Sequence, residues 1–280
     1  MGPIMLFARK PYIGERTPQE CNWIICGRTY KCDLKKLTDS GLTTRYLPVE
    51  YIDGGGYATI YEVQDKRDLS YWAIKVVNKK GDYGYKFPND IKNFEKTKDE
   101  TSVIQSRESF DLGKTGVIVV EWADADMSYR HHIFSDIKTD RQFRLLAKQM
   151  LECIDTLDKK GLYHPTITEN DFLYVKQSGR VKVSALERAF ERDVFKNTAA
   201  LKVVYNVLYR ISTQVDDLGV RSQRVLSKLK NMENWETLKK LVILEVETPE
   251  RLKEIETTTA GSLLKHMAFT AFSADMTLDL

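Results

Sequence analysis

Three features of this 280-residue chain have residue types that could take part in chemistry. The glycine run 54–56 would let a ligand approach the backbone closely, because glycine has no Cβ. Lys75 stands in the apolar run 72–77, where a strand is expected. Taken alone, glycines are typical of any hairpin turn. A lone lysine in a strand is typical of a side chain whose charged end reaches solvent. The position of the glycines two strands before Lys75 favours a shared site. Carboxylates that could act as bases or metal ligands follow at Glu169, Asp171 and Glu187.

The first half of the chain is rich in expected strands. Alternating apolar residues at 49–52 and 59–63 surround the glycines and predict a hairpin, and 72–77 predicts a third strand. The stretch 81–90 contains glycine and proline and is expected to be a loop. Apolar residues then suggest one helix face, and residues 116–122 form a buried strand. The helix rests on Ile91, Phe94, Val103 and Ile104.

The second half is expected to be mainly helical. Residues 140–160 place their apolar side chains on one face, and Gly161 is suited to end this helix in a left-handed conformation. A second hairpin is expected at 172–184 around Ser178 and Gly179, followed by an apolar helix at 198–212 and further helices to about residue 270. The chain therefore predicts an α+β fold with a boundary near residues 123–127.

The order of these elements resembles the eukaryotic protein-kinase family, over residues of about 46–272. The series runs from glycine-rich hairpin to lysine strand, helix, strand, long helix, hairpin and helices. The resemblance implies a two-lobed fold, with a small antiparallel sheet lobe and a mainly helical lobe. It divides the chain into an N-terminal extension (1–45), a sheet lobe with hinge (46–123) and a helical lobe (124–280).

Several residues match positions with which the family holds nucleotide. Lys75, in Trp-Ala-Ile-Lys, would contact the phosphates and pair with a helix glutamate, for which Glu100 is the first choice and Glu95 the second. Asp53 stands at the first glycine position and would oppose phosphate binding. The resemblance therefore implies a vestigial pocket with weak, metal-independent ATP binding at most, and no required cofactor. Its residues are Gly54, Gly55, Gly56, Lys75, Glu100 and Glu121.

The positions that carry catalysis in the family are degenerate. After the retained His164, Thr166 replaces the catalytic aspartate, and a hydroxyl with an ordinary pKa cannot accept the substrate proton as a carboxylate does. Asp171 replaces the metal-binding asparagine, and its oxygens could still bind Mg²⁺. Ala185 replaces the aspartate of Asp-Phe-Gly, in Ala-Leu-Glu, and offers no metal ligand. The resemblance thus implies no catalytic residue and no metal site.

The substrate-docking platform of the family is also missing from the sequence. Residues 193–195 already resemble the opening of the next helix, so the activation segment is very short, and no Ala-Pro-Glu follows. Residues 259–266 resemble the terminal helix of the domain, with Thr257 at the arginine position. In the family, the glutamate of Ala-Pro-Glu pairs with that arginine. The absence of both partners is self-consistent, because either one left alone as a buried charge would cost roughly 3–5 kcal/mol.

The resemblance and its departures predict a pseudokinase that acts as a scaffold or allosteric regulator of a protein partner, with an active kinase as one candidate. Two partner surfaces are proposed, one at the helix with Glu100 and one near Arg188, Glu191 and Arg192. The alternative is a kinase-fold enzyme that uses ATP by a non-standard mechanism, with Glu169, Asp171 and Glu187 as its carboxylates.

Composition argues against other classes of partner. The formal net charge is only +3, and acidic residues interleave with the lysine-rich stretch 79–98, so nucleic-acid binding is the weaker reading. No apolar run approaches the length of a membrane span. Wide gaps and no adjacent histidine argue against a zinc site at the cysteines, so we expect reduced thiols in a cytoplasmic or nuclear protein. The cysteines are Cys21, Cys26, Cys32 and Cys153.

Overall fold

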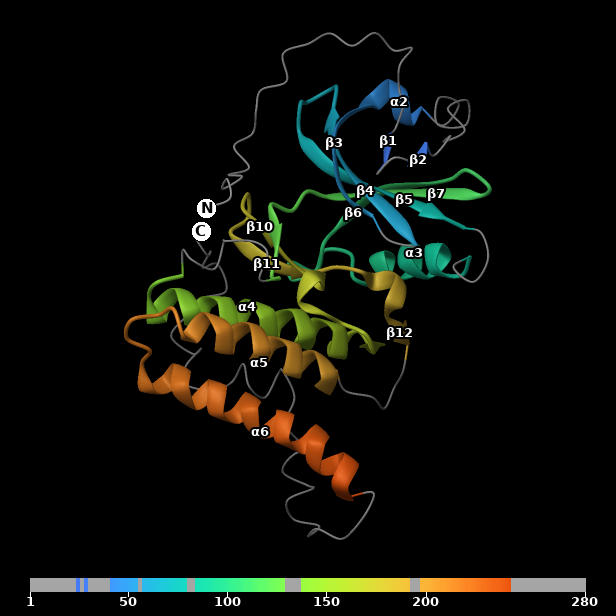
Figure 1. Ribbon diagram of the computed structural model, residues 1–280. Helices are drawn as coiled ribbons and strands as arrows, with labels where there is room; N and C mark the ends of the chain where they lie inside the picture. Colours follow the sequence, from blue (N-terminus) through green and yellow to red (C-terminus); the bar gives the residue numbers. More distant parts are fainter. Residues whose placement is uncertain are drawn as a thin grey trace.

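The computed structural model describes residues 24–25, 28–29, 41–54, 57–79, 84–128, 137–191 and 197–242. Within this part of the chain, an antiparallel sheet lobe is followed by a helical lobe, and Figure 1 shows the sheet above the helices. The predicted two-lobed α+β fold is confirmed. The short strands β1 (Ile24–Ile25) and β2 (Arg28–Thr29) pair antiparallel with each other.

The sheet lobe is built on five antiparallel strands in the order β3-β4-β5-β7-β6. The expected glycine hairpin is β3–β4, and β5 carries Lys75. Strand alternation buries apolar side chains on both faces: Ile74 and Val119 belong to an outer cluster with Tyr61, whereas Ile118 belongs to the main core. The strand bounds are β3 Tyr46–Gly54, β4 Ala58–Asp65, β5 Tyr71–Asn78, β6 Ser106–Asp111 and β7 Thr115–Glu121.

Two helices belong to this lobe. α2 (Leu42–Arg45) precedes β3 and buries Leu42, and α3 (Lys86–Lys96) follows β5. α3 begins inside the stretch expected to be a loop, because Pro88 lies in its first turn, where proline is tolerated. Strand β6 was not predicted from the sequence; its polar composition, with Phe110 as the one aromatic residue, hides the strand pattern.

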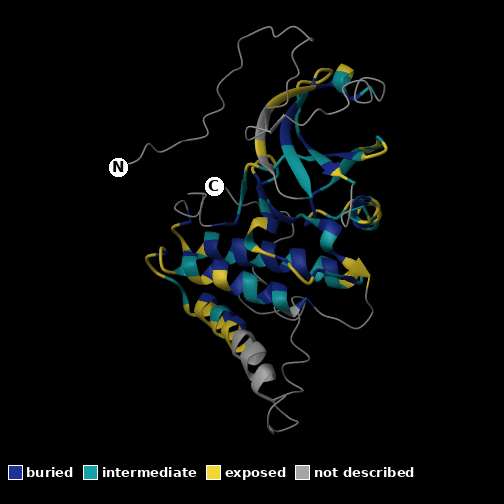
Figure 2. Cartoon of the chain, turned by 45° about the vertical axis from the view of Figure 1, so that its right-hand side comes forward, coloured by how far each residue is buried: buried dark blue, intermediate teal, exposed yellow. Residues whose placement is uncertain are grey.

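The helical lobe confirms the long helices expected from the sequence. α4 (Asp140–Lys159) begins at a capping box between Thr139 and Gln142, and Gly161 follows it with φ +62°. α5 (Thr198–Ser212) packs against α4 and α6 (Val220–Val242). Figure 2 shows the buried faces of α4 and α5 turned toward the interior of the lobe. None of the helices in the described part of the chain is long and apolar enough to span a membrane.

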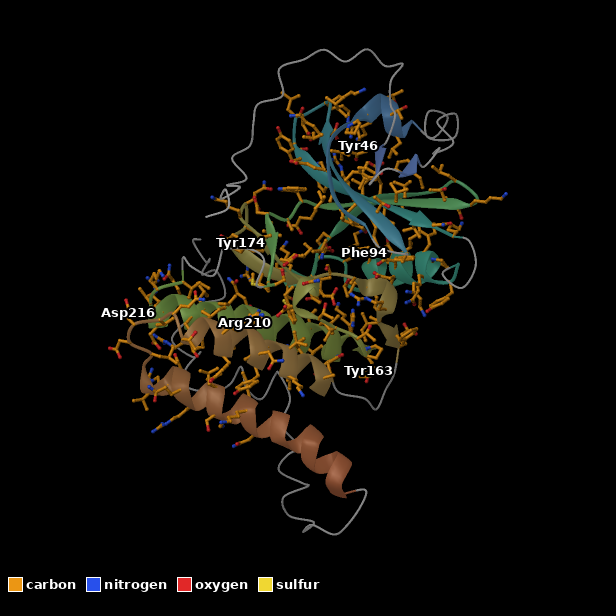
Figure 3. All side chains as sticks on the ribbon, in the orientation of Figure 1. Tyr46, Phe94, Tyr163, Tyr174, Arg210 and Asp216 are labelled. Carbon is orange, nitrogen blue, oxygen red and sulfur yellow. The ribbon has the colours of Figure 1, made fainter. Side chains whose placement is uncertain are left out.

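Short strands and turns lie between the long helices and the sheet lobe. β10 (Phe172–Val175) pairs with β11 (Arg180–Val183), as the second predicted hairpin, and with β8 (Ala125–Asp126). β9 (Leu162–Tyr163) pairs with β12 (Phe190–Glu191), and Tyr163 is labelled in Figure 3. These strands fix two 3₁₀ turns, η3 (Glu169–Asp171) and η4 (Leu186–Arg188), beneath the sheet.

Candidate functional site

Lys75 lies on the face of β5 that points toward α3. Its neighbours across the sheet are Ile60 and Ile118, and Ile118 belongs to the core that includes the apolar face of α3. The Lys75 ammonium donates hydrogen bonds to Asp90 Oδ2 at 2.6 Å and to Glu187 Oε2 at 2.7 Å. Asp90 is completely buried, and the side chains of Lys75 and Glu187 are 11% and 8% exposed. One buried cation therefore joins α3 to the turn η4.

The expected pairing of Lys75 with Glu100 is not the one that the structure contains. Glu100 lies beyond the end of α3 and forms an ion pair with Lys160, at 2.7 Å between Oε1 and Nζ. The runner-up Glu95 is exposed on α3. The helical period could have identified Asp90, because Phe87, Asp90 and Phe94 are three and four residues apart and lie on the buried face.

The electrostatics of the site reflect two carboxylates that share one lysine. Burial raises the pKa of Asp90 to about 6, against the opposing charge of Lys75, and the nearby Glu187 adds to the increase. Burial also acts on Glu187, but the charge and hydrogen bond of Lys75 outweigh it and lower the pKa of Glu187. Burial would lower the pKa of Lys75, but the two carboxylates together raise it. Asp90 Oδ1 has no hydrogen-bond donor among the described residues.

Ala185 forms the turn that directs Glu187 toward Lys75. It has φ +59° and ψ 38°, a left-handed conformation that costs a non-glycine residue roughly 1–2 kcal/mol. Its carbonyl accepts a hydrogen bond from His164 Nε2 at 3.1 Å. His164 is buried, this burial lowers its pKa, and its hydrogen bond helps to hold the turn.

Asp171 is held by groups of its own chain. Its Oδ2 accepts hydrogen bonds from the Thr168 amide at 2.7 Å and the Thr168 hydroxyl at 3.0 Å, and its Oδ1 pairs with the Arg188 guanidinium. Arg188 Nη1 also donates to the carbonyl of the exposed Thr166, at 3.2 Å. A guanidinium thus lies against Asp171, the carboxylate at the position of the family's metal-binding asparagine.

The residues present do not fit the Mg²⁺–nucleotide group that a kinase-like fold implies. Ala185 offers no ligand, Asp171 is paired with Arg188, and both carboxylates at Lys75 are negative where a phosphate would add further negative charge. Among the described residues, no cluster of three or more histidine, cysteine or acidic side chains could hold a metal ion.

Glu121, at the hinge between the lobes and at the edge of the predicted pocket, is also bonded to other groups of the chain. Both carboxylate oxygens of Glu121 accept hydrogen bonds from Lys182 Nζ, at 2.6 and 2.8 Å, and the Glu121 amide donates to the Gln105 carbonyl at 2.9 Å. Gly54 ends β3. Gly55 and Gly56, like the side chain of Asp53, lie outside the described residues.

The start of α5 is anchored by Asn197, a residue that was not predicted from the sequence to have a role. Its Oδ1 accepts from the His164 amide at 2.8 Å, and its Nδ2 donates to Asp158 Oδ1 at 2.7 Å and to the Leu162 carbonyl at 2.9 Å. An asparagine just before an apolar helix is typical of an N-cap and could have drawn attention to this position, although its side chain makes no capping hydrogen bond to α5. Residues 193–195 and 257–266, and the clustered cysteines 21, 26 and 32, lie outside the described residues, while Cys153 is buried in α4.

Comparisons with known proteins point to protein kinases. The chain is 23% identical over 150 residues to a probable myosin light chain kinase of Dictyostelium discoideum, covering 52% of this chain and 48% of that protein. It is 22% identical over 143 residues to sperm motility kinases 3A and 3B of Mus musculus, covering 51% of this chain and 28% of each kinase. The match therefore spans about half of the first relative and less of the others. No family model matches the chain. These distant similarities and the two-lobed fold support a kinase-like protein.

Proposed function

We propose that this chain is a pseudokinase, which acts as a scaffold or allosteric regulator of a protein partner such as an active protein kinase. The observation that carries the proposal is the set of substitutions at the catalytic positions. Thr166 is exposed, and its carbonyl accepts a hydrogen bond from Arg188. The side chain of Ala185 has no group that could bind a metal ion. The remaining carboxylate, Asp171, forms an ion pair with Arg188.

The pairing of the other acidic groups weighs against an ATP-using enzyme of non-standard mechanism. Glu187 is bonded to Lys75, and Glu169 Oε2 lies 2.8 Å from Arg210 Nη2. A general base must reach a substrate proton in its ionised form. Here each candidate carboxylate already has a cationic partner, so the geometry favours a structural role for all three.

The two partner surfaces proposed from the sequence change in character. Glu100 lies after α3 rather than on it, and bonds Lys160. Arg188 bonds Asp171, and Glu191 bonds Lys92 and Lys96 of α3, while Arg192 lies outside the described residues. A variant that neutralises this second group would therefore remove the ion pair between Arg188 and Asp171 as well as the exposed contacts of Glu191 with α3. The exposed face of α3 is the better-defined candidate for partner contact.

Phosphate transfer is the test of this function. The full chain is incubated with radiolabelled ATP, Mg²⁺ or Mn²⁺ and generic protein substrates, with an active kinase as the positive control. We expect no label on substrate or on the chain itself. Label that disappears in Lys75→Arg, a variant that retains the positive charge and is checked for folding by circular dichroism, would refute the proposal.

The regulatory part of the proposal needs a partner. A protein that co-purifies with the chain is identified by mass spectrometry, and its own activity is measured with and without the purified chain. If the partner is a kinase, we expect its rate to change at stoichiometric chain concentrations. An unchanged rate across saturating concentrations would leave no regulatory role for that pair.

A further inference from the structure

A continuous series of alternating charges crosses the junction between the lobes. It runs from Asp90 through Lys75, Glu187 and Arg188 to Asp171. The successive links are 2.6 Å, 2.7 Å and 3.6 Å, followed by the direct ion pair between Arg188 and Asp171. The first two residues belong to the sheet lobe, the middle two to η4, and Asp171 to the helical lobe. All of these side chains are largely removed from solvent, with Arg188 the most exposed at 28%.

Neutral hydrogen bonds reinforce the same contact. Asn89 donates from Nδ2 to the carbonyls of Glu187 and Ala189, at 3.0 and 2.9 Å. The buried Asn93 donates to the carbonyls of Leu186 and Ala189, at 2.8 and 2.9 Å. One face of α3 is therefore bonded to the backbone of residues 186–189 by two asparagines one helical turn apart. Figure 1 shows α3 directly above the segment that leads to β12.

We propose that residues 185–189 are a built-in strap that holds the two lobes in one fixed arrangement without nucleotide or metal. Glu187 supplies the anion that Lys75 binds, and Arg188 supplies the cation that Asp171 binds. Both are internal ligands carried by a single 3₁₀ turn. The strap then explains why the site does not fit a Mg²⁺–nucleotide group. Lys75 and Asp171 cannot bind the strap and also bind phosphate and metal.

The strap does not depend on the absence of phosphate transfer, although it adds to the proposed function. A kinase-like protein with fixed lobes presents one constant surface of α3 to a partner. If the strap is wrong, the chain can still be inactive because of Thr166 and Ala185. If phosphate transfer were found, the contacts of residues 185–189 with α3 would still be open to test.

Hydrogen exchange of the α3 backbone amides tests the strap in the full chain. In the wild type, we expect the α3 amides to be equally protected from exchange with and without about 1 mM ATP and Mg²⁺, because the strap already fixes α3. In Glu187→Gln, which keeps the shape but removes the charge, we expect exchange of α3 to rise by about tenfold or more, given the strength of charged hydrogen bonds. The matched control is Glu191→Gln, which removes an exposed carboxylate that also touches α3 and leaves α3 exchange nearly unchanged.

Two outcomes would overturn the strap. One is equal α3 exchange in Glu187→Gln and Glu191→Gln. The other is a wild-type α3 that becomes protected only when ATP and Mg²⁺ are added. This second arm uses no variant, so the test holds even if Glu187→Gln fails to fold.

Discussion

Two completely buried aspartates of the sheet lobe have opposite surroundings. Asp65, at the end of β4, lies between three arginines, with distances of 3.0 Å to Arg45 Nε, 3.2 Å to Arg67 Nη2 and 3.1 Å to Arg107 Nη1. Asp90, on α3, shares its single lysine with Glu187. The first aspartate has cations in excess, and the second has a second anion beside it.

The pKa values respond accordingly. Burial acts against the ionised form of Asp65, but the hydrogen bonds from Arg67 and Arg45 hold its pKa well below the usual range. Burial raises the pKa of Asp90 to about 6. The Asp65 cluster therefore stabilises its own lobe, whereas the Asp90 cluster joins two lobes at an electrostatic cost.

The largest expected effect is at the one cation of the Asp90 cluster. Lys75→Met leaves the buried Asp90 without its cation and leaves Glu187 with only the more distant Arg188, at 3.6 Å, so we expect it to lower the free energy of unfolding by about 3–5 kcal/mol. Chemical denaturation measures this loss. The matched control is Lys182→Met, another buried lysine, whose partner Glu121 is single and 22% exposed. A smaller loss for Lys75→Met than for Lys182→Met would contradict the account.

A smaller loss is expected at the cluster with excess cations. Asp65→Asn removes the shared anion, but its arginines are 21%, 60% and 25% exposed and can be solvated. We expect a loss of about 1–3 kcal/mol at pH 7. Because the folded pKa is lowered, this contribution is present above the unfolded pKa of about 3.9 and is lost as the pH falls further. The difference from the wild type should shrink below about pH 4, and a constant difference would argue against the ion pairs.

An effect of the opposite sign, with the opposite pH dependence, is expected for Asp90→Asn. An unfolded aspartate loses its proton near pH 3.9, whereas folded Asp90 keeps it to about pH 6. Between these values the folded state binds more protons, so wild-type stability falls as the pH rises. The charged groups that set this pKa are Lys75 on β5 and Glu187 on η4. Asp90→Asn should gain stability relative to the wild type from pH 4 to 6, and a relative loss would show that Lys75 fully compensates Asp90.

The fold and the site differ in how far the sequence predicts them. The long helices α4 and α5 and both hairpins follow from local patterns, because each has a clear period and a clear end such as Gly161. The carboxylate that pairs with Lys75 could not be predicted in the same way. Glu100 has the expected residue type, but it lies beyond the end of α3 and pairs with Lys160. The pairing of Arg188 with Asp171 joins residues 17 positions apart, through the left-handed turn at Ala185. A turn made by a non-glycine residue leaves no local signal in the sequence.

The most direct test of the central claim is a calorimetric titration of the wild-type chain with ATP, in Mg²⁺ and then in EDTA. If Glu187 and Arg188 already satisfy Lys75 and Asp171, no saturable Mg²⁺-dependent binding should appear below roughly 1 mM ATP, a free energy of about −4 kcal/mol. Saturable binding in the micromolar range that requires Mg²⁺ would contradict the account, because the metal and the phosphates would then have displaced both internal ligands.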